Sequence, residues 1–440
     1  MVSDRPNTFP ESQWAILEQQ VASLLLYSSV WEDEVGQAFF SVLSAMQQPE
    51  QNLSQVLWAY GQLFKALSAT HKSWRDYLVQ RILESDNPFT LQVQHHPLEQ
   101  LPAELLEAVQ YDLTVLQQLW QWHVDDLPQA IGQLGGPVLP ALPSTTQTHD
   151  SQTVAFLKEY DHWADALPAL AEYHRQVGCG LMAQYRAFSW HEGQLQGHPY
   201  PDEIAMDALV GYEDQRDQLL NNTEALLRGY PALNILLYGS RGAGKSAMIK
   251  ALLPLYGDRG LRLIEVCKSA LIELPQILES LQNCPQKFII FVDDLSFEED
   301  EESYKALKVV LEGHVAASPH NVIVYATSNR RHLIREFFDD RPSPSDGDEI
   351  HAWDTVQEKL SLSDRFGLTL TFTPANQETY LKMVFHLAGK ANLVLDEADL
   401  KFRALQWATR HNGRSGRTAR QFIDFLQAEL ALAADSGDLG

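Results

Sequence analysis

The sequence is poor in cysteine and in long apolar runs, and each shortage excludes a class of protein. Its 440 residues include only three cysteines, Cys179, Cys267 and Cys284, without the spacing of a metal site. That argues against a disulfide framework and fits a reducing compartment. No apolar run approaches the roughly 20 residues of a membrane helix, and the N-terminus lacks the basic start and apolar run of a secretory signal. We therefore expect a cytoplasmic protein that does not enter a membrane.

Basic residues are also scarce. The chain has 33 Lys and Arg against 58 Asp and Glu, a formal net charge of −25. Residues 1–200 alone carry 8 basic and 22 acidic residues, a balance of −14. A chain this acidic has no overall attraction to nucleic acid or to an anionic membrane, although a local basic patch could still bind DNA.

Glycine is nearly absent from residues 11–134, which are rich in Leu, Gln, Glu, Ala and Trp. This mixture favours helix, and the apolar residues recur at helical spacing. We predict a helical N-terminal domain at 1–134, a Gly- and Pro-rich linker at 135–152, and a further helical segment at 153–205. The tryptophans of these helices are expected to lie mostly in the core.

From about residue 206 the pattern changes, because short β-rich runs alternate with helical stretches. The runs are apolar on both faces, as in a buried parallel sheet, and their spacing suits βα units with right-handed crossovers. They are residues 234–238, 261–266, 288–292, 322–327 and 368–372. This pattern predicts an α/β domain at 206–374, a helical region at 375–432 and a tail at 433–440.

A glycine-rich stretch, GSRGAGKSAMIKALL, follows the first of these runs. It fits G-x-x-x-x-G-K-[ST], in which backbone N–H groups wrap around a phosphate at the start of a helix. Lys245 is expected to reach the β- and γ-phosphates of ATP, and Ser246 to hold Mg²⁺ through its hydroxyl. The predicted nucleotide contacts of this loop are Gly239, Ser240, Arg241, Gly242, Ala243, Gly244, Lys245, Ser246 and Ala247.

Two acids, Asp293 and Asp294, end the run at 288–292. Asp293 is expected to hold Mg²⁺ through a metal-bound water. Asp294 stands where many ATPases with such a phosphate loop carry a glutamate that orients the attacking water. An aspartate side chain is one methylene shorter than a glutamate. Two alternatives stay open: Glu298 could take that role, or Asp294 could be a supporting carboxylate. The acids from Glu298 to Glu302 are otherwise expected to be a solvated helix start.

Two further segments resemble the adenine-side and sensor motifs of AAA+ ATPases. LVGYEDQRDQLL resembles the motif before the phosphate loop, which implies that Val210, Gly211 and Tyr212 line the base pocket. VIVYATSNRRHL resembles the fourth strand and its polar sensor, which implies that Asn329 lies between the sheet and the γ-phosphate.

Two other segments resemble the arginine motifs of the same superfamily. KLSLSDRFGLTLTF is similar to the stretch that carries the arginine finger, and the matching residue is Arg365. SGRTARQFIDFL resembles the start of the lid helix with the second sensor arginine, best matched by Arg417, with Arg420 as the alternative. A guanidinium on a transferring γ-phosphoryl group can accelerate the reaction roughly 10³–10⁵-fold. Without that role Arg365 would be an ordinary surface residue.

The lid arginines form a cluster, which needs an anionic partner in so acidic a chain. ATP is the first interpretation, and a salt-bridge network and a DNA backbone are the alternatives. The cluster consists of Arg410, Arg414, Arg417 and Arg420.

More narrowly, LLYGSRGAGKS, FVDDLSFEEDE, YATSNRRHLI, SLSDRFGL and RSGRTARQF are similar to a bacterial family of predicted AAA+ ATPases known only as a domain of unknown function. The resemblance covers roughly residues 150–432. It implies that residues 206–374 form a nucleotide-binding αβα core with five parallel strands in the order 5-1-4-3-2, and that residues 375–432 form its helical lid. It also implies binding of Mg-ATP and assembly into a ring, with a hexamer favoured. It does not supply a substrate.

Three functions fit these observations. The first is an ATPase that remodels or moves a protein client held by the N-terminal helices. The second is an ATP-dependent nucleic-acid loader, which the net charge disfavours. The third is a switch or scaffold that binds ATP and hardly hydrolyses it. Lys245, Asn329, Arg365 and Arg417 together favour turnover.

Overall fold

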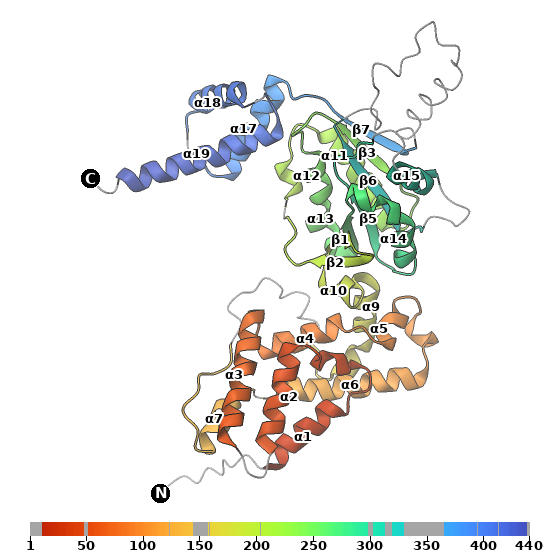
Figure 1. Ribbon diagram of the computed structural model, residues 1–440, viewed down its shortest axis with the longest axis vertical. Coiled ribbons are helices and arrows are strands. Elements are labelled where there is room, and N and C mark those ends of the chain that lie inside the picture. Colours follow the sequence, from red (N-terminus) through yellow and green to blue (C-terminus); the bar gives the residue numbers. More distant parts are fainter. Residues whose placement is uncertain are drawn as a thin grey trace. The chain divides into compact units, whose positions relative to one another are not determined.

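The chain divides into two compact units, Met1–Gln184 and Tyr185–Gly440, in the computed structural model (Figure 1). None of the helices that the structure describes combines the length and the apolar character needed to cross a membrane. The described residues are 11–47, 52–122, 124–143, 157, 159–202, 204–297, 302–312, 319–329, 365–393, 395–411 and 413–437.

The N-terminal unit is helical, as the sequence predicts. Polar caps define several of its helix starts. The side chains of Asn52 and Ser73 accept hydrogen bonds from backbone N–H groups of the helices that they precede, and Asn87 forms a reciprocal capping box with Thr90. Its α-helices are α1 (Glu11–Ala22), α2 (Glu34–Gln47), α3 (Leu53–Thr70), α4 (Trp74–Glu84), α5 (Pro88–Val93), α6 (Ala103–Gln121), α7 (Leu127–Gln133), α9 (Leu167–Val177) and α10 (Leu181–Gln184).

Aromatic side chains fill much of this core. The rings of Trp31, Phe39 and Trp74 form one cluster, with centroid distances of 5.6 Å (Trp31–Phe39), 4.3 Å (Phe39–Trp74) and 6.1 Å (Trp31–Trp74). Trp163 is also buried, as the sequence predicts for most tryptophans of these helices, whereas Trp58 is 67% exposed on α3. The core thus takes its tryptophans from helices far apart in the sequence, because burial of these large rings gives the greatest hydrophobic gain.

One histidine, His174 on α9, is fully buried in this unit. Its Nδ1 lies 2.9 Å from the carbonyl oxygen of Gly178. Burial lowers the pKa of His174 to about 4, and the contact with Gly178 opposes that shift. The folded unit therefore holds this imidazole neutral, whereas an unfolded chain would protonate it near pH 6.5.

The N-terminal unit should consequently lose stability as the pH falls from about 6.5 to about 4. The pKa of His174 is lower in the folded chain than in the unfolded chain. Its contribution to the free energy of unfolding is therefore complete above pH 6.5 and is lost as the pH falls to about 4, a change of about 3 kcal/mol. Urea unfolding of the full chain, followed by tryptophan fluorescence at pH 7, 5.5 and 4, measures this change. His174→Gln should flatten the pH dependence and the exposed His95→Gln should not; an unchanged slope in His174→Gln contradicts the assignment.

Among the residues that the structure describes, the C-terminal unit is built on a sheet of seven strands in the order β2-β1-β4-β5-β6-β3-β7. Its last five strands are parallel neighbours and follow the predicted order 5-1-4-3-2. The strands are β1 (Ala187–His191), β2 (Gln194–His198), β3 (Ile235–Gly239), β4 (Leu261–Glu265), β5 (Lys287–Val292), β6 (Val322–Ser328) and β7 (Leu368–Phe372).

The prediction of five strands was too few, because β1 and β2 form a hairpin that extends the sheet. This hairpin lies inside the segment 153–205 that we predicted to be helical. The two-residue turn, Glu192 and Gly193, has positive φ at both positions (49° and 78°), which matches the twist of paired strands. β1 then pairs in parallel with β4. A period of two in two five-residue strands is too short a signal to outweigh the helical pattern before it.

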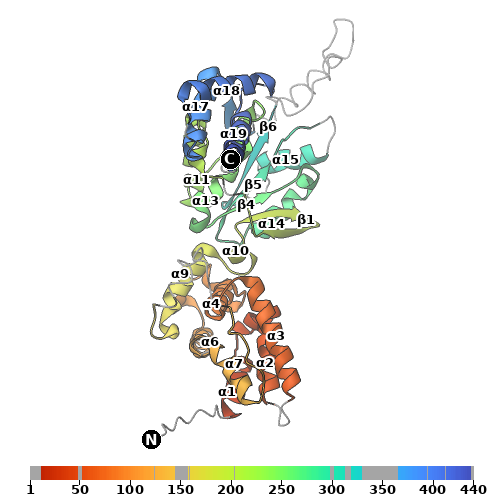
Figure 2. The same cartoon turned by 90° about the vertical axis from the view of Figure 1, so that its left-hand side faces the viewer.

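Helices cover both faces of this sheet, with α11 to α13 on one side and α14 and α15 on the other (Figures 1 and 2). The central strands are buried on both faces, which explains their uninterrupted apolar runs. Helices α17 to α19 follow β7 and are referred to below as the lid. These helices are α11 (Glu213–Leu227), α12 (Lys245–Lys250), α13 (Leu252–Tyr256), α14 (Leu274–Leu281), α15 (Glu302–Glu312), α17 (Gln377–Lys390), α18 (Glu397–Arg410) and α19 (Gly416–Gly437).

Candidate nucleotide-binding site

The glycine-rich loop connects the end of β3 to the start of α12, at the carboxyl edge of the sheet. Gly239 has φ +135°, and a Cβ there would lie 2.0 Å from the carbonyl oxygen of Phe372 on β7. Gly244, with φ +93°, turns the chain into α12. These two glycines are therefore required by backbone geometry.

The same loop is attached to the lid. Gly242 has φ +73°, and its carbonyl oxygen accepts a hydrogen bond of 3.1 Å from the backbone N–H of Arg417 at the start of α19. A Cβ on Gly242 would lie 2.9 Å from the hydroxyl oxygen of Ser415. The lid thus contacts the loop at a glycine, and a Cβ at position 242 would require Ser415 to shift.

Lys245 is 7% exposed and directs its ammonium group toward neutral oxygens. It donates to the carbonyl oxygens of Gly239 (2.9 Å) and Ser240 (2.8 Å) and to Oδ1 of Asn329 (3.0 Å). Burial lowers the pKa of Lys245, while Asp294 and Asp293 raise it and Arg241 lowers it. No acid within the described part of the chain forms an ion pair with this buried cation, so its charge is available to a ligand.

The two aspartates after β5 face different partners. Oδ1 of Asp293 accepts hydrogen bonds from the hydroxyls of Ser246 (2.6 Å) and Thr327. Asp294 has φ +49°, in the left-handed region, and its Oδ1 accepts a hydrogen bond of 2.6 Å from Nδ2 of Asn329. Adjacent residues of an ordinary strand point to opposite faces, so the change of backbone conformation at Asp294 brings both carboxylates to one site.

Thr327, near the end of β6, connects these groups, and our sequence reasoning missed it. Its hydroxyl donates to Asp293 and accepts the backbone N–H of Asp294 at 2.9 Å. Its position two residues before Asn329 could have identified Thr327 as a site residue, because residues i and i+2 of a strand lie on the same face. Asn329 in turn joins Lys245 to Asp294, so a continuous set of hydrogen bonds links the loop to both acids.

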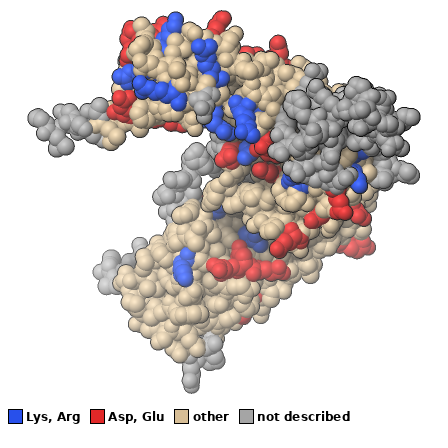
Figure 3. Space-filling model, turned by 45° about the horizontal axis from the view of Figure 1, so that its top comes forward, with Lys and Arg blue, Asp and Glu red and all other residues tan. Residues whose placement is uncertain are grey.

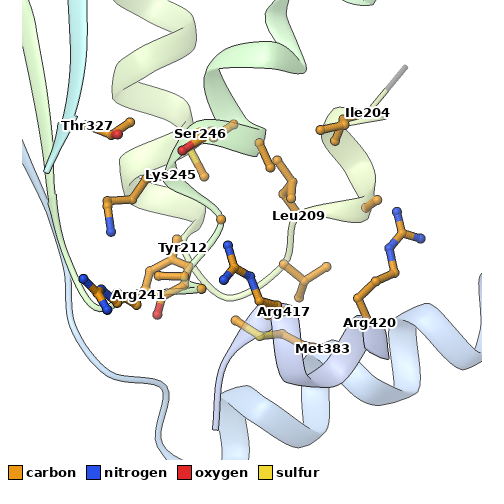
Figure 4. A pocket seen from close by; sticks show the side chains of 18 of the residues that line it. Ile204, Leu209, Tyr212, Arg241, Lys245, Ser246, Thr327, Met383, Arg417 and Arg420 are labelled. Atoms are coloured by element: carbon orange, nitrogen blue, oxygen red, sulfur yellow. The ribbon is translucent and has the colours of Figure 1, made fainter. Parts of the chain in front are cut away.

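These groups open into one cavity of about 560 Å³ between the loop and the lid (Figure 4). This volume lies in the range of small-molecule sites. Its polar groups are the side chains of Arg241, Lys245, Ser246, Asp293, Asp294, Thr327, Asn329, Arg417 and Arg420. Its apolar side is formed by Ile204, Ala208, Leu209, Val210, Tyr212, Met383 and Leu387. The cavity is therefore polar around Lys245 and apolar around Leu209, and the lid arginines Arg417 and Arg420 lie beside Met383 at this apolar end (Figure 4).

Three of its cations are arginines without an acidic partner among the described residues. They are Arg241, Arg417 and Arg420. Figure 3 shows Lys and Arg side chains gathered over the lid of this acidic protein. Most other described arginines form ion pairs, for example Arg81 with Asp33, Arg186 with Asp258, Arg259 with Glu224 and Arg403 with Glu429.

The apolar end is held to the lid by two ion pairs. Lys382 of α17 binds Glu213 at 2.7 Å, and Lys390 binds Asp207 at 2.5 Å. The bond with Lys382 lowers the pKa of Glu213 to about 2. A Cβ on Gly211 would lie 2.6 Å from Cγ2 of Thr379. The segment before α11 thus packs tightly on α17, and the two together line the apolar part of the cavity.

The structure brings most of the predicted site residues together, and several lie elsewhere. Val210, Tyr212, Asn329, both aspartates, Arg417 and loop residues 241–247 line the cavity. Gly211 borders a smaller neighbouring pocket, and Gly239 and Ser240 contribute carbonyl oxygens to Lys245. Arg365 is half-buried before β7 and does not line the cavity. Glu298 lies outside the described residues.

The residues present fit a magnesium ion held together with a nucleotide. Within the described ranges, no group of three or more His, Cys, Asp or Glu side chains could hold a metal by itself. Ser246 and Asp293 instead offer two hard oxygen ligands in hydrogen-bond contact beside the loop. Mg²⁺ is commonly bound by one or two such groups, with phosphate oxygens and waters completing its shell.

The strand order, the loop between strand and helix, and the helical lid define an AAA+-like P-loop fold. The chain belongs to the family described as "Protein of unknown function (DUF815)", whose model matches residues 183–430.

Similarity to solved structures is weak. The Thermotoga maritima RuvB Holliday junction branch migration motor is 16% identical, with a TM-score of 0.36, over 52% of this chain and 66% of that one. The Aeropyrum pernix ORC1 protein, solved in complex with DNA, is 18% identical, with a TM-score of 0.38, over 54% and 63%. This chain thus spans about two thirds of those proteins. No curated protein matches it.

Proposed function

We propose that this protein is an ATPase that binds and hydrolyses Mg-ATP. The observation that carries the proposal is the cavity beside the glycine loop, which is lined by four cations, Lys245, Arg241, Arg417 and Arg420. None of these four cations forms an ion pair with an acid in the described part of the chain. Unpaired cations repel one another, so a polyanion such as a triphosphate would stabilise the site.

The groups of the cavity divide naturally between the parts of ATP. The loop N–H groups and the N-terminus of α12 would bind the phosphates, and Lys245 would reach the β- and γ-phosphates. The apolar end formed by Leu209, Val210 and Met383 would hold the base. Ser246 and Asp293 would hold Mg²⁺, Asp293 through a water; the ion would neutralise charge on the β- and γ-oxygens.

Asp294 is the proposed base for hydrolysis. The oxygen of a water attacks the γ-phosphorus and transfers a proton to the Asp294 carboxylate. The bond from the γ-phosphorus to the β–γ bridging oxygen breaks, and its electron pair stays on ADP. The products are ADP and inorganic phosphate, and Asp294 then releases its proton to solvent. Asn329, which binds both Lys245 and Asp294, would keep this carboxylate beside the terminal phosphate.

A slow-hydrolysing switch is the second candidate, and the Asp294 contact favours it. Oδ1 of Asp294 is already bound by Asn329 at 2.6 Å, and the side chain is one methylene shorter than glutamate. Both features limit its reach toward a water. The rate of steady-state phosphate release distinguishes a working ATPase from a switch.

We further propose that the protein acts as an oligomeric ring, a hexamer being favoured, in the cytoplasm. The support is Arg365, which does not line the cavity of its own chain. The N-terminal helical domain, 1–134, would hold a protein client. A nucleic-acid partner remains the less favoured alternative at a net charge of −25. DNA binding measured over a range of salt concentrations tests it, because phosphate contacts give a steep salt dependence.

Lys245→Ala should weaken Mg-ATP binding on the order of 100-fold, because it removes a charge-assisted contact to the phosphates. Titration calorimetry of the full chain with Mg-ATP measures the effect. Lys250→Ala is a matched control: it lies on the same helix, pairs with surface acids and is outside the cavity. Native affinity in Lys245→Ala would show that the cavity is not a phosphate site.

A further inference from the structure

Arg241 places a side-chain cation inside the phosphate loop itself, between Ser240 and Gly242. The loop pattern requires glycines, a lysine and a hydroxyl, and it leaves position 241 unspecified. Arg241 is exposed and lines the cavity, and no ion pair or hydrogen bond ties its side chain to another described residue. Its guanidinium is therefore accessible from the cavity and available for a ligand.

The position of Arg241 points to one end of the proposed nucleotide. In Figure 4 its guanidinium lies toward the ammonium group of Lys245, whereas Arg417 and Arg420 come from the lid on the other side of the loop. Arg241 is also among the charges that act on the Lys245 ammonium. That ammonium binds Asn329, which binds Asp294. Arg241 thus stands at the end of the cavity where the proposed reaction takes place.

We propose that the Arg241 guanidinium binds the terminal phosphate and makes the site selective for a nucleoside triphosphate over a diphosphate. This inference rests on the proposed function of the cavity. A guanidinium presents several N–H donors in a planar fork that fits two phosphate oxygens at once. Arg241 and Lys245 repel each other when no anion lies between them. A γ-phosphate relieves that repulsion, and a diphosphate, which ends earlier, does not.

The ratio of the dissociation constants for Mg-ADP and Mg-ATP tests this role, and it does not depend on turnover. In Arg241→Ala the affinity for Mg-ATP should fall roughly 10- to 100-fold, as for loss of a charge-assisted hydrogen bond. The affinity for Mg-ADP should change little, so the ratio of the Mg-ADP to the Mg-ATP dissociation constant should fall roughly 10- to 100-fold. In Arg241→Lys this ratio should lie between the values of the native chain and of Arg241→Ala, because lysine keeps the positive charge and lacks the planar guanidinium.

The matched control is Arg228→Ala, which changes an exposed arginine at the C-terminal cap of α11 that pairs with Glu224 outside the cavity. It should leave both constants unchanged. The inference is overturned if Arg241→Ala weakens both nucleotides equally, or neither. If the native chain binds neither nucleotide, the proposed function fails and this inference with it. Thermal unfolding checks that the variant is folded; if Arg241→Ala does not fold, Arg241→Lys carries the same comparison.

Discussion

Arg365→Ala chains should bind Mg-ATP normally and hydrolyse it roughly 10³–10⁵-fold more slowly than native chains, the range for loss of an arginine finger. The expectation follows from the position of Arg365: it precedes β7, the edge strand beside β3, and it does not line the cavity of its own chain. A guanidinium outside its own site can act on the nucleotide of a neighbouring subunit. Activity per subunit should accordingly rise with protein concentration as rings form.

Mixing Arg365→Ala chains with Lys245→Ala chains, each impaired in hydrolysis at limiting Mg-ATP, distinguishes action in trans from a structural role. Arg365→Ala chains retain an intact cavity, and Lys245→Ala chains retain Arg365. In a mixed ring, a Lys245→Ala chain can supply Arg365 to the intact cavity of a neighbouring Arg365→Ala chain, so phosphate release should partly recover. A mixture that stays inactive while light scattering shows co-assembly contradicts action in trans. Arg228→Ala in place of Arg365→Ala is the control, and it should be active without any partner.

Asp294→Asn should bind Mg-ATP with native affinity and stall, with hydrolysis slowed roughly 10²–10⁴-fold, as for loss of a general base. Asp293→Asn should behave differently and weaken the Mg²⁺-dependent part of binding, because Asp293 is the acid bonded to Ser246. Single-turnover hydrolysis of pre-bound ATP is the suitable measurement, since it separates the chemical step from binding and product release.

Two further variants decide whether Asp294 is placed correctly. Asp294→Glu lengthens the side chain by one methylene and should speed hydrolysis if the native reach toward water limits the rate. Glu298→Gln tests the alternative base. If Asp294→Asn hydrolyses ATP at the native rate and Glu298→Gln is inactive, Asp294 is a supporting carboxylate and the base has been assigned wrongly.

The elements predicted correctly from the sequence are those that short-range patterns specify. The apolar runs at 234–238 and 288–292 became β3 and β5, because a strand buried on both faces must be apolar throughout. The phosphate loop followed from glycines at fixed spacing between a strand and a helix. The order of the five parallel strands came from the family resemblance, and the structure confirms it.

The β1–β2 hairpin shows where such patterns fail. Its strands are short, and their alternation is weak beside the helical run that precedes them. What makes them strands is the pairing of β1 with β4, which lies more than 70 residues further along the chain. Tertiary pairing of this kind overrides local propensity.

The sequence by itself thus determined the chemistry of the site: a loop lysine and hydroxyl, and two acids at the end of a strand. Only the tertiary structure decided how they are connected. It brought Thr327 onto both aspartates, turned Asp294 toward Asn329, and seated the N-terminus of α19 on Gly242, 175 residues away. Hydrogen bonds between residues so distant in the chain depend on how the sheet and the lid pack, and no local pattern of residues encodes that packing.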